Sequence, residues 1–118
     1  MYYIGTDIVE VSRIKSLIDK YDGKFLNRIF TIEEIDYCLN KRYPYIHFSG
    51  RFSAKEAIVK SISSFNIDSS IPLRSINIIN NSNGKPIPIC NLFDNINLDL
   101  SISHTSDYAV AFAIASTK

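Results

Sequence analysis

The 118-residue sequence has little net charge, few cysteines and no long hydrophobic run. Thirteen basic and twelve acidic residues leave a formal net charge of +1, which argues against non-specific nucleic-acid binding because such binding needs a strongly basic surface. No apolar run approaches the ~20 residues that span a bilayer. The opening segment Met-Tyr-Tyr-Ile also lacks the basic stretch of a secretion signal. These features predict a soluble cytoplasmic protein that does not bind a membrane.

The chain has two cysteines, Cys38 and Cys90, which are far apart in sequence and fall in no metal-ligand spacing. We therefore expect two reduced, partly buried thiols rather than a disulfide. No internal repeat or low-complexity linker divides the chain, and its length suits a single domain, 1–118, with a modest core. The hydrophobic content of 46% is high for this size and leaves apolar surface available for a subunit interface.

Hydrophobic periodicity predicts helices in the first half of the chain. After a β-branched strand at residues 2–9, apolar residues recur at helical spacing from Ile14 to Tyr21, and Gly23 is the expected stop. Thr31 to Glu34 matches a capping box that opens a short helix. Pro44 is expected to close that region, and a long helix follows at about 46–64.

After Ser64 the pattern changes to strand period. Strands are predicted at 73–80 and 87–90, joined by the turn Asn83-Gly84-Lys85-Pro86. Residues 98–104 alternate apolar and polar, and from Tyr108 to Ile114 large apolar residues alternate with alanine, so that strand can pack on both faces. The segment 105–107 connects these two strands as a hairpin. The expected fold class is α+β, with N-terminal helices packed on an antiparallel sheet.

The long helix contains the most informative residues. Arg51 and Lys55 fall on the same face as Phe48 and Phe52, so two cations stand one turn apart in an apolar stripe. An anionic ligand would relieve their repulsion. Glu56 lies at the edge of this stripe, which places an acid beside a cationic pocket, as a metal-assisted phosphate site requires. The alternatives are an exposed ion pair between Glu56 and Lys60, and cationic stems that extend to solvent.

Three more polar residues stand in unusual settings. Asp7 lies in the apolar segment Ile4-Gly5-Thr6-Asp7-Ile8-Val9, where a carboxylate needs a cation, a metal or backbone donors, unless it only ends the strand and caps the next helix. His104 ends its strand on the apolar side, either as a core histidine or as an imidazole aimed at a phosphate. Lys85 is either a solvated turn residue or a phosphate clamp.

Together these residues resemble the bacterial holo-[acyl-carrier-protein] synthases of the 4′-phosphopantetheinyl transferase superfamily. Five segments resemble family motifs, occur in the family's order and cover nearly the whole chain. They are Ile4–Ile14 with Gly5, Asp7 and Arg13, Arg28–Glu34, Gly50–Ala57 with Lys60, Asn83–Pro86, and Ser101–Thr105. In one departure, Ser63-Ser64-Phe65-Asn66 stands where the family commonly has a Gly-Thr-Gly loop.

The resemblance implies the 4′-phosphopantetheinyl transferase fold and an enzyme of fatty acid biosynthesis. Such enzymes transfer the 4′-phosphopantetheine arm of coenzyme A to a serine of apo-acyl carrier protein and release adenosine 3′,5′-bisphosphate. By resemblance, Asp7 and Glu56 hold a Mg²⁺ ion, and Asp7, Glu56 and Lys60 are the catalytic residues. Magnesium suits such a site because it binds a couple of carboxylates together with phosphate oxygens and water.

The resemblance also implies the binding residues. Those expected around coenzyme A are Arg51, Lys60, Lys85, Pro86, His104 and Thr105. Arg13 matches the helix that meets the acidic carrier protein. Family members are homotrimers with each active site between two chains, so Lys85 and His104 are expected to serve a neighbour's Asp7 and Glu56.

A second class of function competes with the transferase. A non-catalytic module could bind a polyanion such as RNA through Arg51, Lys55 and Lys60, with a steep salt dependence and no magnesium requirement. The near-neutral charge and the carboxylates close to these cations favour the transferase.

Overall fold

The structure, a computed structural model, describes residues 1–65 and 71–118. Within these residues there are four helices and five strands, and three short 3₁₀ turns lie at Ser63–Phe65, Leu73–Ser75 and Asn91–Phe93. In chain order they are β1 (Tyr2–Glu10), α1 (Val11–Tyr21), α2 (Gly23–Ile29), α3 (Ile32–Leu39), α4 (Pro44–Ile62), β2 (Asn77–Asn80), β3 (Pro86–Ile89), β4 (Ile96–His104) and β5 (Tyr108–Thr117).

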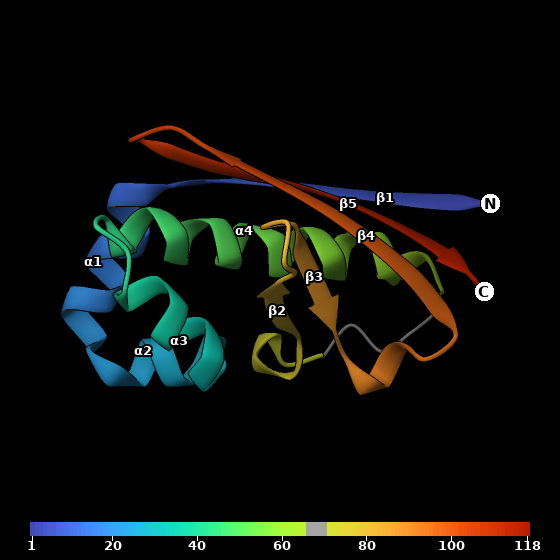
Figure 1. The fold of residues 1–118 in the computed structure, drawn as a ribbon, viewed down its shortest axis with the longest axis horizontal. Helices are drawn as coiled ribbons and strands as arrows, with labels where there is room; N and C mark the ends of the chain where they lie inside the picture. Colours follow the sequence, from blue (N-terminus) through green and yellow to red (C-terminus); the bar gives the residue numbers. More distant parts are fainter. Residues whose placement is uncertain (66–70) are drawn as a thin grey trace.

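The main sheet is antiparallel and has the strand order β1-β5-β4. The last strand of the chain is therefore central, and it pairs with the first strand along its whole length, from Tyr2 opposite Ser116 to Glu10 opposite Tyr108. Strands β2 and β3 form a separate hairpin. Figure 1 shows the sheet as one layer above α4, with α1, α2 and α3 beside one end of α4 and the hairpin beside its middle. The predicted α+β class with an antiparallel sheet is confirmed by this arrangement.

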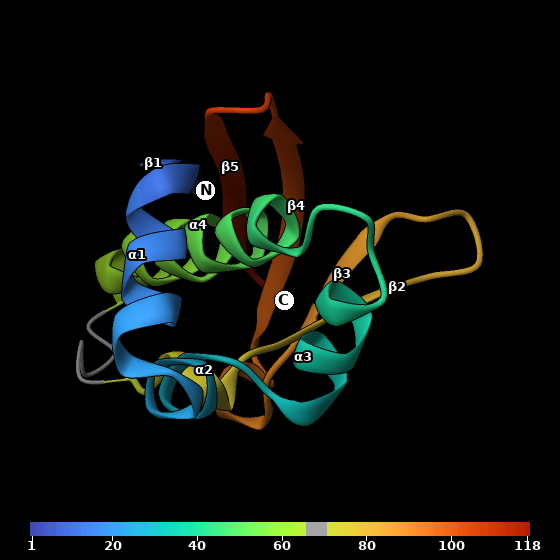
Figure 2. The ribbon, with the colours of Figure 1, turned by 90° about the vertical axis from the view of Figure 1, so that its left-hand side faces the viewer.

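Small residues bring α4 close to the sheet. On β5, every second residue from 109 to 115 is a buried alanine that faces the helix. On β1, a Cβ atom at Gly5 would overlap the carbonyl oxygen of Ala57 and lie 2.7 Å from the backbone nitrogen of Ser61. Only glycine permits this backbone approach. Figure 2, turned by 90°, shows the helix and the sheet as adjacent layers.

The other face of the sheet is apolar and open to solvent. Ile4 and Ile8 on β1 are 61% and 66% exposed, and Phe112 on β5 is 43% exposed. Ile4 pairs with Ile114, and Ile8 pairs with Val110, so these side chains form a continuous surface across the two strands. The alternation in the last strand thus separates an alanine face packed on α4 from a large apolar face that remains exposed among the described residues.

Several predicted boundaries were wrong. Pro44 opens α4 rather than closing the preceding region, because proline fits the first turn of a helix. The first helix ends at Tyr21, so its predicted stop at Gly23 is confirmed. Periodicity missed α2, however, which begins at Gly23 after the chain turns at Asp22, whose φ is +51°. Residues Leu73–Ser75 form a 3₁₀ turn rather than part of a strand. The capping box at Thr31 and Glu34 is confirmed, with both reciprocal hydrogen bonds present.

The buried surface of the long helix extends beyond the apolar stripe that the sequence indicated. The helix is buried on most of its circumference, between the sheet, α1, α3 and the hairpin, and its buried residues include Ser49, Ser53 and Lys55. Among residues 1–65 and 71–118, no helix is both long enough and apolar enough to span a membrane.

Candidate active site

Asp7 of β1 and Lys60 of α4 form an ion pair at the interface of strand and helix. Lys60 Nζ lies 3.2 Å from Asp7 Oδ1 and donates a second hydrogen bond, of 3.0 Å, to the carbonyl oxygen of Thr6. The backbone of Asp7 is anchored to the same helix, because Ser53 Oγ donates to its carbonyl oxygen at 2.8 Å. β1 continues through Glu10, which is also the N-cap residue of α1. Asp7 therefore neither ends the strand nor caps the next helix.

Glu56 presents its carboxylate next to Asp7. Partial burial raises the pKa of Glu56, and the charge of Asp7 raises it further, while Lys60 and Arg13 act in the opposite direction. The structure thus brings these four sequence-predicted residues into one electrostatic group. The alternative of an ordinary ion pair between Glu56 and Lys60 does not hold, since Lys60 pairs with Asp7.

The donor set of this group suits a hard divalent cation. Two carboxylates come from different elements, and partial desolvation makes their mutual repulsion costly without a cation. In the described part of the chain, no cluster of three or more His, Cys, Asp or Glu side chains could enclose a metal. A pair of carboxylates that leaves room for water and phosphate oxygens is the arrangement that Mg²⁺ uses. Asp7 and Glu56 therefore fit the predicted ion.

The expectation that one ligand would relieve both Arg51 and Lys55 was wrong for Lys55. Lys55 is fully buried and pairs with Glu34 of α3, with Nζ and Oε1 separated by 2.6 Å. It also donates to the carbonyl oxygens of Ile29 and Leu73, at 2.8 and 3.1 Å. The anion that Lys55 requires is supplied by the capping-box glutamate, so Lys55 is unavailable to any ligand.

Arg51 is a cation in an apolar setting, as the sequence predicted. It is only 6% exposed, and its guanidinium lies over the ring of Tyr37, 4.2 Å from the ring centroid. One of its terminal nitrogens donates to Oδ1 of Asn80 on β2 at 3.0 Å, while Nε is buried without a hydrogen-bond partner among the described residues. A buried guanidinium with a free donor and no carboxylate partner is suited to an anionic ligand.

His104 and Thr105 lie at the end of β4. His104 is exposed rather than a core residue, and its ring lies 5.7 Å from that of His47 on α4, centroid to centroid. Thr105 shapes the tight connection to β5, because its Oγ1 accepts hydrogen bonds from the backbone nitrogens of Asp107 and Tyr108. The predicted hairpin is confirmed.

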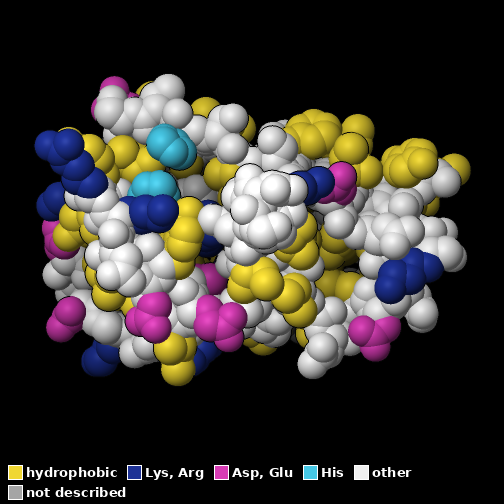
Figure 3. Space-filling model, in the orientation of Figure 1, with side chains coloured by type: hydrophobic (Ala, Val, Ile, Leu, Met, Phe, Trp, Pro, Cys, Tyr) yellow, Lys and Arg dark blue, Asp and Glu magenta, His cyan; other side chains and the backbone are white. Residues whose placement is uncertain are grey.

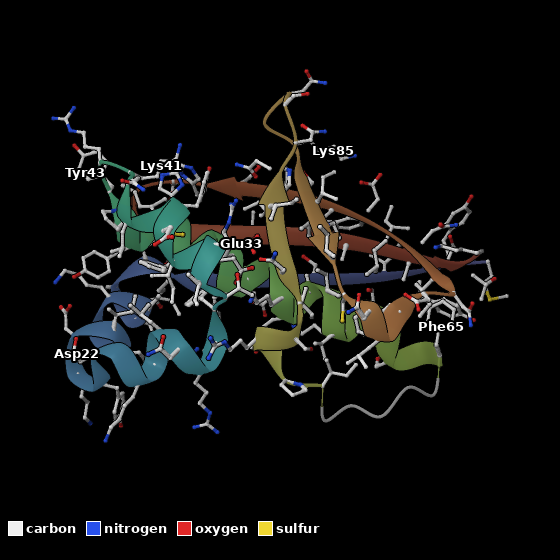
Figure 4. The ribbon with its side chains drawn as sticks, turned by 60° about the horizontal axis from the view of Figure 1, so that its bottom comes forward. Asp22, Glu33, Lys41, Tyr43, Phe65 and Lys85 are labelled. Atoms are coloured by element: carbon white, nitrogen blue, oxygen red, sulfur yellow. The ribbon has the colours of Figure 1, made fainter. Side chains whose placement is uncertain are left out.

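Lys85 and Pro86 lie where the β2–β3 hairpin approaches β4. Lys85 Nζ is 2.7 Å from Asp99 Oδ1, and both side chains are half-exposed or more. The two hairpin residues line a pocket of about 400 Å³ whose other wall includes Phe112 and Ile114 on the open face of the sheet. Figure 4 shows Lys85 at the turn of the hairpin, on the side nearer the strands of the main sheet.

Within one chain the predicted site residues do not form a single cluster, because Arg51 and Glu56 lie on different sides of α4. Arg51 and Glu56 are five residues apart and therefore point about 140° apart around the helix axis. Arg51 faces α3 and β2, whereas Glu56 faces β1. Sequence reasoning missed the neighbours of Arg51, namely Tyr37, His47 and Asn80. Only His47 had a sequence signal, since it precedes Arg51 by one helical turn.

Comparison with known proteins supports the resemblance seen in the sequence. The family model described as the 4′-phosphopantetheinyl transferase superfamily matches residues 3–113. A holo-[acyl-carrier-protein] synthase of Protochlamydia amoebophila is 44% identical over 119 residues, with 97% of each chain covered.

Solved structures agree with the fold. The holo-(acyl-carrier-protein) synthase of Bacillus anthracis, in complex with CoA (3′,5′-ADP), superposes with a TM-score of 0.84 at 32% identity and covers 98% of this chain and 96% of its own. The Helicobacter pylori synthase, in complex with coenzyme A, superposes with a TM-score of 0.83 at 30% identity, over 96% of this chain and 99% of its own.

Proposed function

The chain belongs to the 4′-phosphopantetheinyl transferase superfamily, among its holo-[acyl-carrier-protein] synthases, and we propose Asp7, Glu56 and Lys60 as its catalytic residues. The enzyme transfers 4′-phosphopantetheine from coenzyme A to apo-acyl carrier protein, a step of fatty acid biosynthesis. The serine oxygen attacks the phosphorus that carries pantetheine, the diphosphate bond breaks, and adenosine 3′,5′-bisphosphate leaves. The observation that carries the assignment of residues is the approach of Asp7 and Glu56, from two different elements, around one lysine.

Mg²⁺ is the ion that Asp7 and Glu56 would hold. Bound there, it would neutralise the diphosphate and stabilise the charge that develops on the leaving oxygen. Lys60 holds Asp7 in place through its ion pair and adds positive charge beside the reacting phosphate. Glu56, or a water held at the same site, would accept the serine proton. No protein nucleophile is needed, because phosphoryl-type transfer depends mainly on positioning and electrostatics.

Coenzyme A would be bound by cationic and polar residues of α4, of the hairpin and of the end of β4. Arg51 offers a buried guanidinium with a free Nε–H donor. Lys85 and Pro86 border the pocket beside the sheet, and His104 and Thr105 stand at the exposed end of β4. Lys60 completes this set from the catalytic group.

A homotrimer would join the separate groups of one chain into complete sites. Lys85 and Pro86 border a pocket whose floor is the open apolar face of the sheet, at Phe112 and Ile114. A neighbouring copy seated on that face would bring its own Asp7 and Glu56 toward this hairpin. Packing between copies would also bury large apolar side chains that are 36–66% exposed in the single chain, such as Ile4, Ile8 and Ile114.

Arg13 is the residue that we propose for carrier-protein docking. It lies exposed near the start of α1 and is close enough to Glu56 to lower the pKa of that carboxyl. An acidic carrier protein that binds α1 would therefore place its serine near the catalytic group. We also propose a cytoplasmic location.

Mass spectrometry of apo-acyl carrier protein tests the proposal. The protein is incubated with coenzyme A, Mg²⁺ and the carrier protein, and we expect a mass gain of one phosphopantetheine arm that chelation of the metal prevents. Asp7→Asn and Glu56→Gln should each abolish the gain, while circular dichroism shows an unchanged fold. Wild-type activity in both variants would overturn the metal assignment, and RNA binding with steep salt dependence and no carrier modification would select the polyanion-binding alternative.

A further inference from the structure

The only two histidines of the chain lie side by side. His47 is on the first turns of α4, and His104 is 57 residues further along, at the end of β4. Their ring centroids are 5.7 Å apart and their planes are inclined by 67°. Figure 3 shows the two histidine side chains as neighbours on one face of the molecule, with Lys and Arg side chains beside them. Two imidazoles at this distance are compatible when neutral and repel each other when both are protonated.

The cations around this pair have no acidic partner in the described residues. The ring of Tyr37 contacts the His47 ring at 6.0 Å and has Arg51 and Lys41 over it, at 4.2 and 4.7 Å from its centroid. None of Lys41, Arg51, His47 and His104 forms an ion pair within residues 1–65 and 71–118. Arg51 in addition keeps a buried Nε–H without a hydrogen-bond acceptor. Positive charge without a counterion, next to a free buried donor, indicates an anion-binding site.

The surroundings of His47 oppose its protonation in the free protein. Burial lowers the pKa of His47 most, and the charges of His104, Lys41 and Arg51 lower it further. These are the charged groups that face it, from β4, from the turn after α3 and from its own helix, and Tyr37 of α3 is the remaining titratable neighbour. His47 is thus neutral near pH 7. A phosphate dianion placed among these groups would favour the protonated form of His47.

We propose that His47 and His104 form a proton-linked pair that binds a phosphate group of coenzyme A, and that His47 takes up a proton when the phosphate binds. This inference rests on the proposed function and adds His47 to the binding residues. The proton comes from solvent, and no covalent bond is made. Protonated His47 then donates a charge-assisted hydrogen bond to the phosphate. Lys41 and Arg51 provide the permanent charge, so the histidines adjust affinity to pH rather than create it.

Isothermal titration calorimetry tests the pair. Coenzyme A is titrated into the wild-type protein with Mg²⁺ at pH 7.5, in two buffers of different ionisation enthalpy, which gives the number of protons taken up. We expect proton uptake by the wild type and clearly less by His47→Gln, which keeps a hydrogen-bond donor but does not titrate. His47→Gln should bind up to about tenfold more weakly at pH 6.5, the effect of one pKa unit, and equally well at pH 9. Lys20→Gln, which removes a cation from an exposed position on α1, should behave as wild type.

Proton NMR gives a direct second measurement, since only two histidine ring signals exist in this chain. Addition of coenzyme A should move the titration midpoint of His47 to higher pH. A repeat with 3′-dephospho-coenzyme A identifies the phosphate, because loss of the shift assigns the pair to the monoester and retention assigns it to the diphosphate.

Two results would overturn the inference, and they differ in what else they affect. Equal proton uptake in wild type and His47→Gln, with an unmoved His47 midpoint, would eliminate the pair and leave the transferase intact if the carrier protein is still modified. Failure of the wild type to bind coenzyme A at all would defeat both the pair and the proposed function.

Discussion

Lys55 Nζ lies 2.6 Å from Oε1 of Glu34, and neither side chain is exposed to solvent. Oε1 also accepts the backbone N–H of Thr31, and Oε2 accepts that of Ile78 at 2.8 Å. One glutamate therefore connects the start of α3, the middle of α4 and the first strand of the hairpin that carries Lys85. The predicted phosphate clamp and the helix that carries Glu56 are fixed to each other through this buried pair.

Removal of one member of the Lys55–Glu34 pair should strongly destabilise the protein. Lys55→Met leaves Glu34 buried without its cation, and we expect a loss of about 3–5 kcal/mol in the free energy of unfolding, because an uncompensated buried charge is costly. Urea denaturation followed by circular dichroism measures it. The double variant Lys55→Met with Glu34→Gln should be more stable than Lys55→Met alone, since it buries no charge. A double variant that is less stable than the single one would contradict this account.

Gly5 should not tolerate a methyl group. Gly5→Ala would drive Cβ into the backbone of α4 at Ala57, and neither backbone can move freely, so we expect a loss of about 3 kcal/mol or more. Gly23→Ala is the matched control. Its new Cβ meets only the side-chain nitrogen of Asn27 at 3.6 Å, and the free energy of unfolding should change by less than about 1 kcal/mol. Comparable losses in thermal unfolding would exclude the close approach at Gly5 as the cause.

The pKa of Glu56 makes the stability of the metal-free protein depend on pH. Because burial and Asp7 raise this pKa above its ordinary value of 4.5, the folded state binds the proton more tightly than the unfolded state. Stability is therefore lost as pH rises from about 4.5 through the folded pKa. With the metal chelated, Glu56→Gln should have a higher Tm than wild type at pH 8 and the same Tm at pH 4. Mg²⁺ should raise the Tm of wild type and not of the variant, as differential scanning fluorimetry would show.

The open face of the sheet should control assembly. Phe112→Asp introduces a charge on that face, and we expect the proposed trimer to dissociate into single chains, with activity lost because each proposed site would need two copies. Light scattering should give three times the 13.4 kDa chain mass for wild type and one times for the variant. Leu92→Asp is the control, since Leu92 is 60% exposed on a turn away from this face. A monomeric wild type with full activity would remove the trimer from the proposal.

Charge reversal on α1 should weaken binding of the carrier protein without weakening binding of coenzyme A. Arg13→Glu would set a negative charge against an acidic carrier protein, and we expect KM for that protein to rise roughly tenfold or more, while KM for coenzyme A changes little. Lys118→Glu makes the same change at the C-terminus, at the other end of the molecule from α1 (Figure 1), and should affect neither. Equal effects of Arg13→Glu on both substrates would end the docking role.

The sequence predicted the elements that have strong local signals. The capping box at Thr31 and the alternating strand before His104 depend on neighbours a few residues away, and both were confirmed. The short helix α2 was missed, and Pro44 and Leu73–Ser75 were assigned to the wrong elements. Both cysteines are free in the structure, as the spacing indicated.

The site was harder to predict because it depends on distant pairs. Asp7 and Lys60 are 53 residues apart, and Arg51 and Asn80 are 29 apart, so no periodicity connects them. Lys55 was misread for the same reason, since its partner Glu34 comes from another helix. The family resemblance predicted Asp7 and Glu56 as ligands of one ion. The residue pattern alone also allowed Asp7 to be only the end of a strand. The departure at residues 63–66 lies partly outside the described residues, with Asn66 beyond them.

The alanines of β5 act as a spacer. With Ala109, Ala111, Ala113 and Ala115 against α4, the gap between helix and strands is set by methyl groups, the thinnest side-chain layer that a sheet can offer. A valine at any of these positions would lift the helix and widen the opening between the two carboxylates. Residues with no chemistry of their own would thereby limit the size of the ion that the proposed site at Asp7 and Glu56 can hold, and an attempt to transplant this proposed centre into another protein would have to carry that thin layer with it.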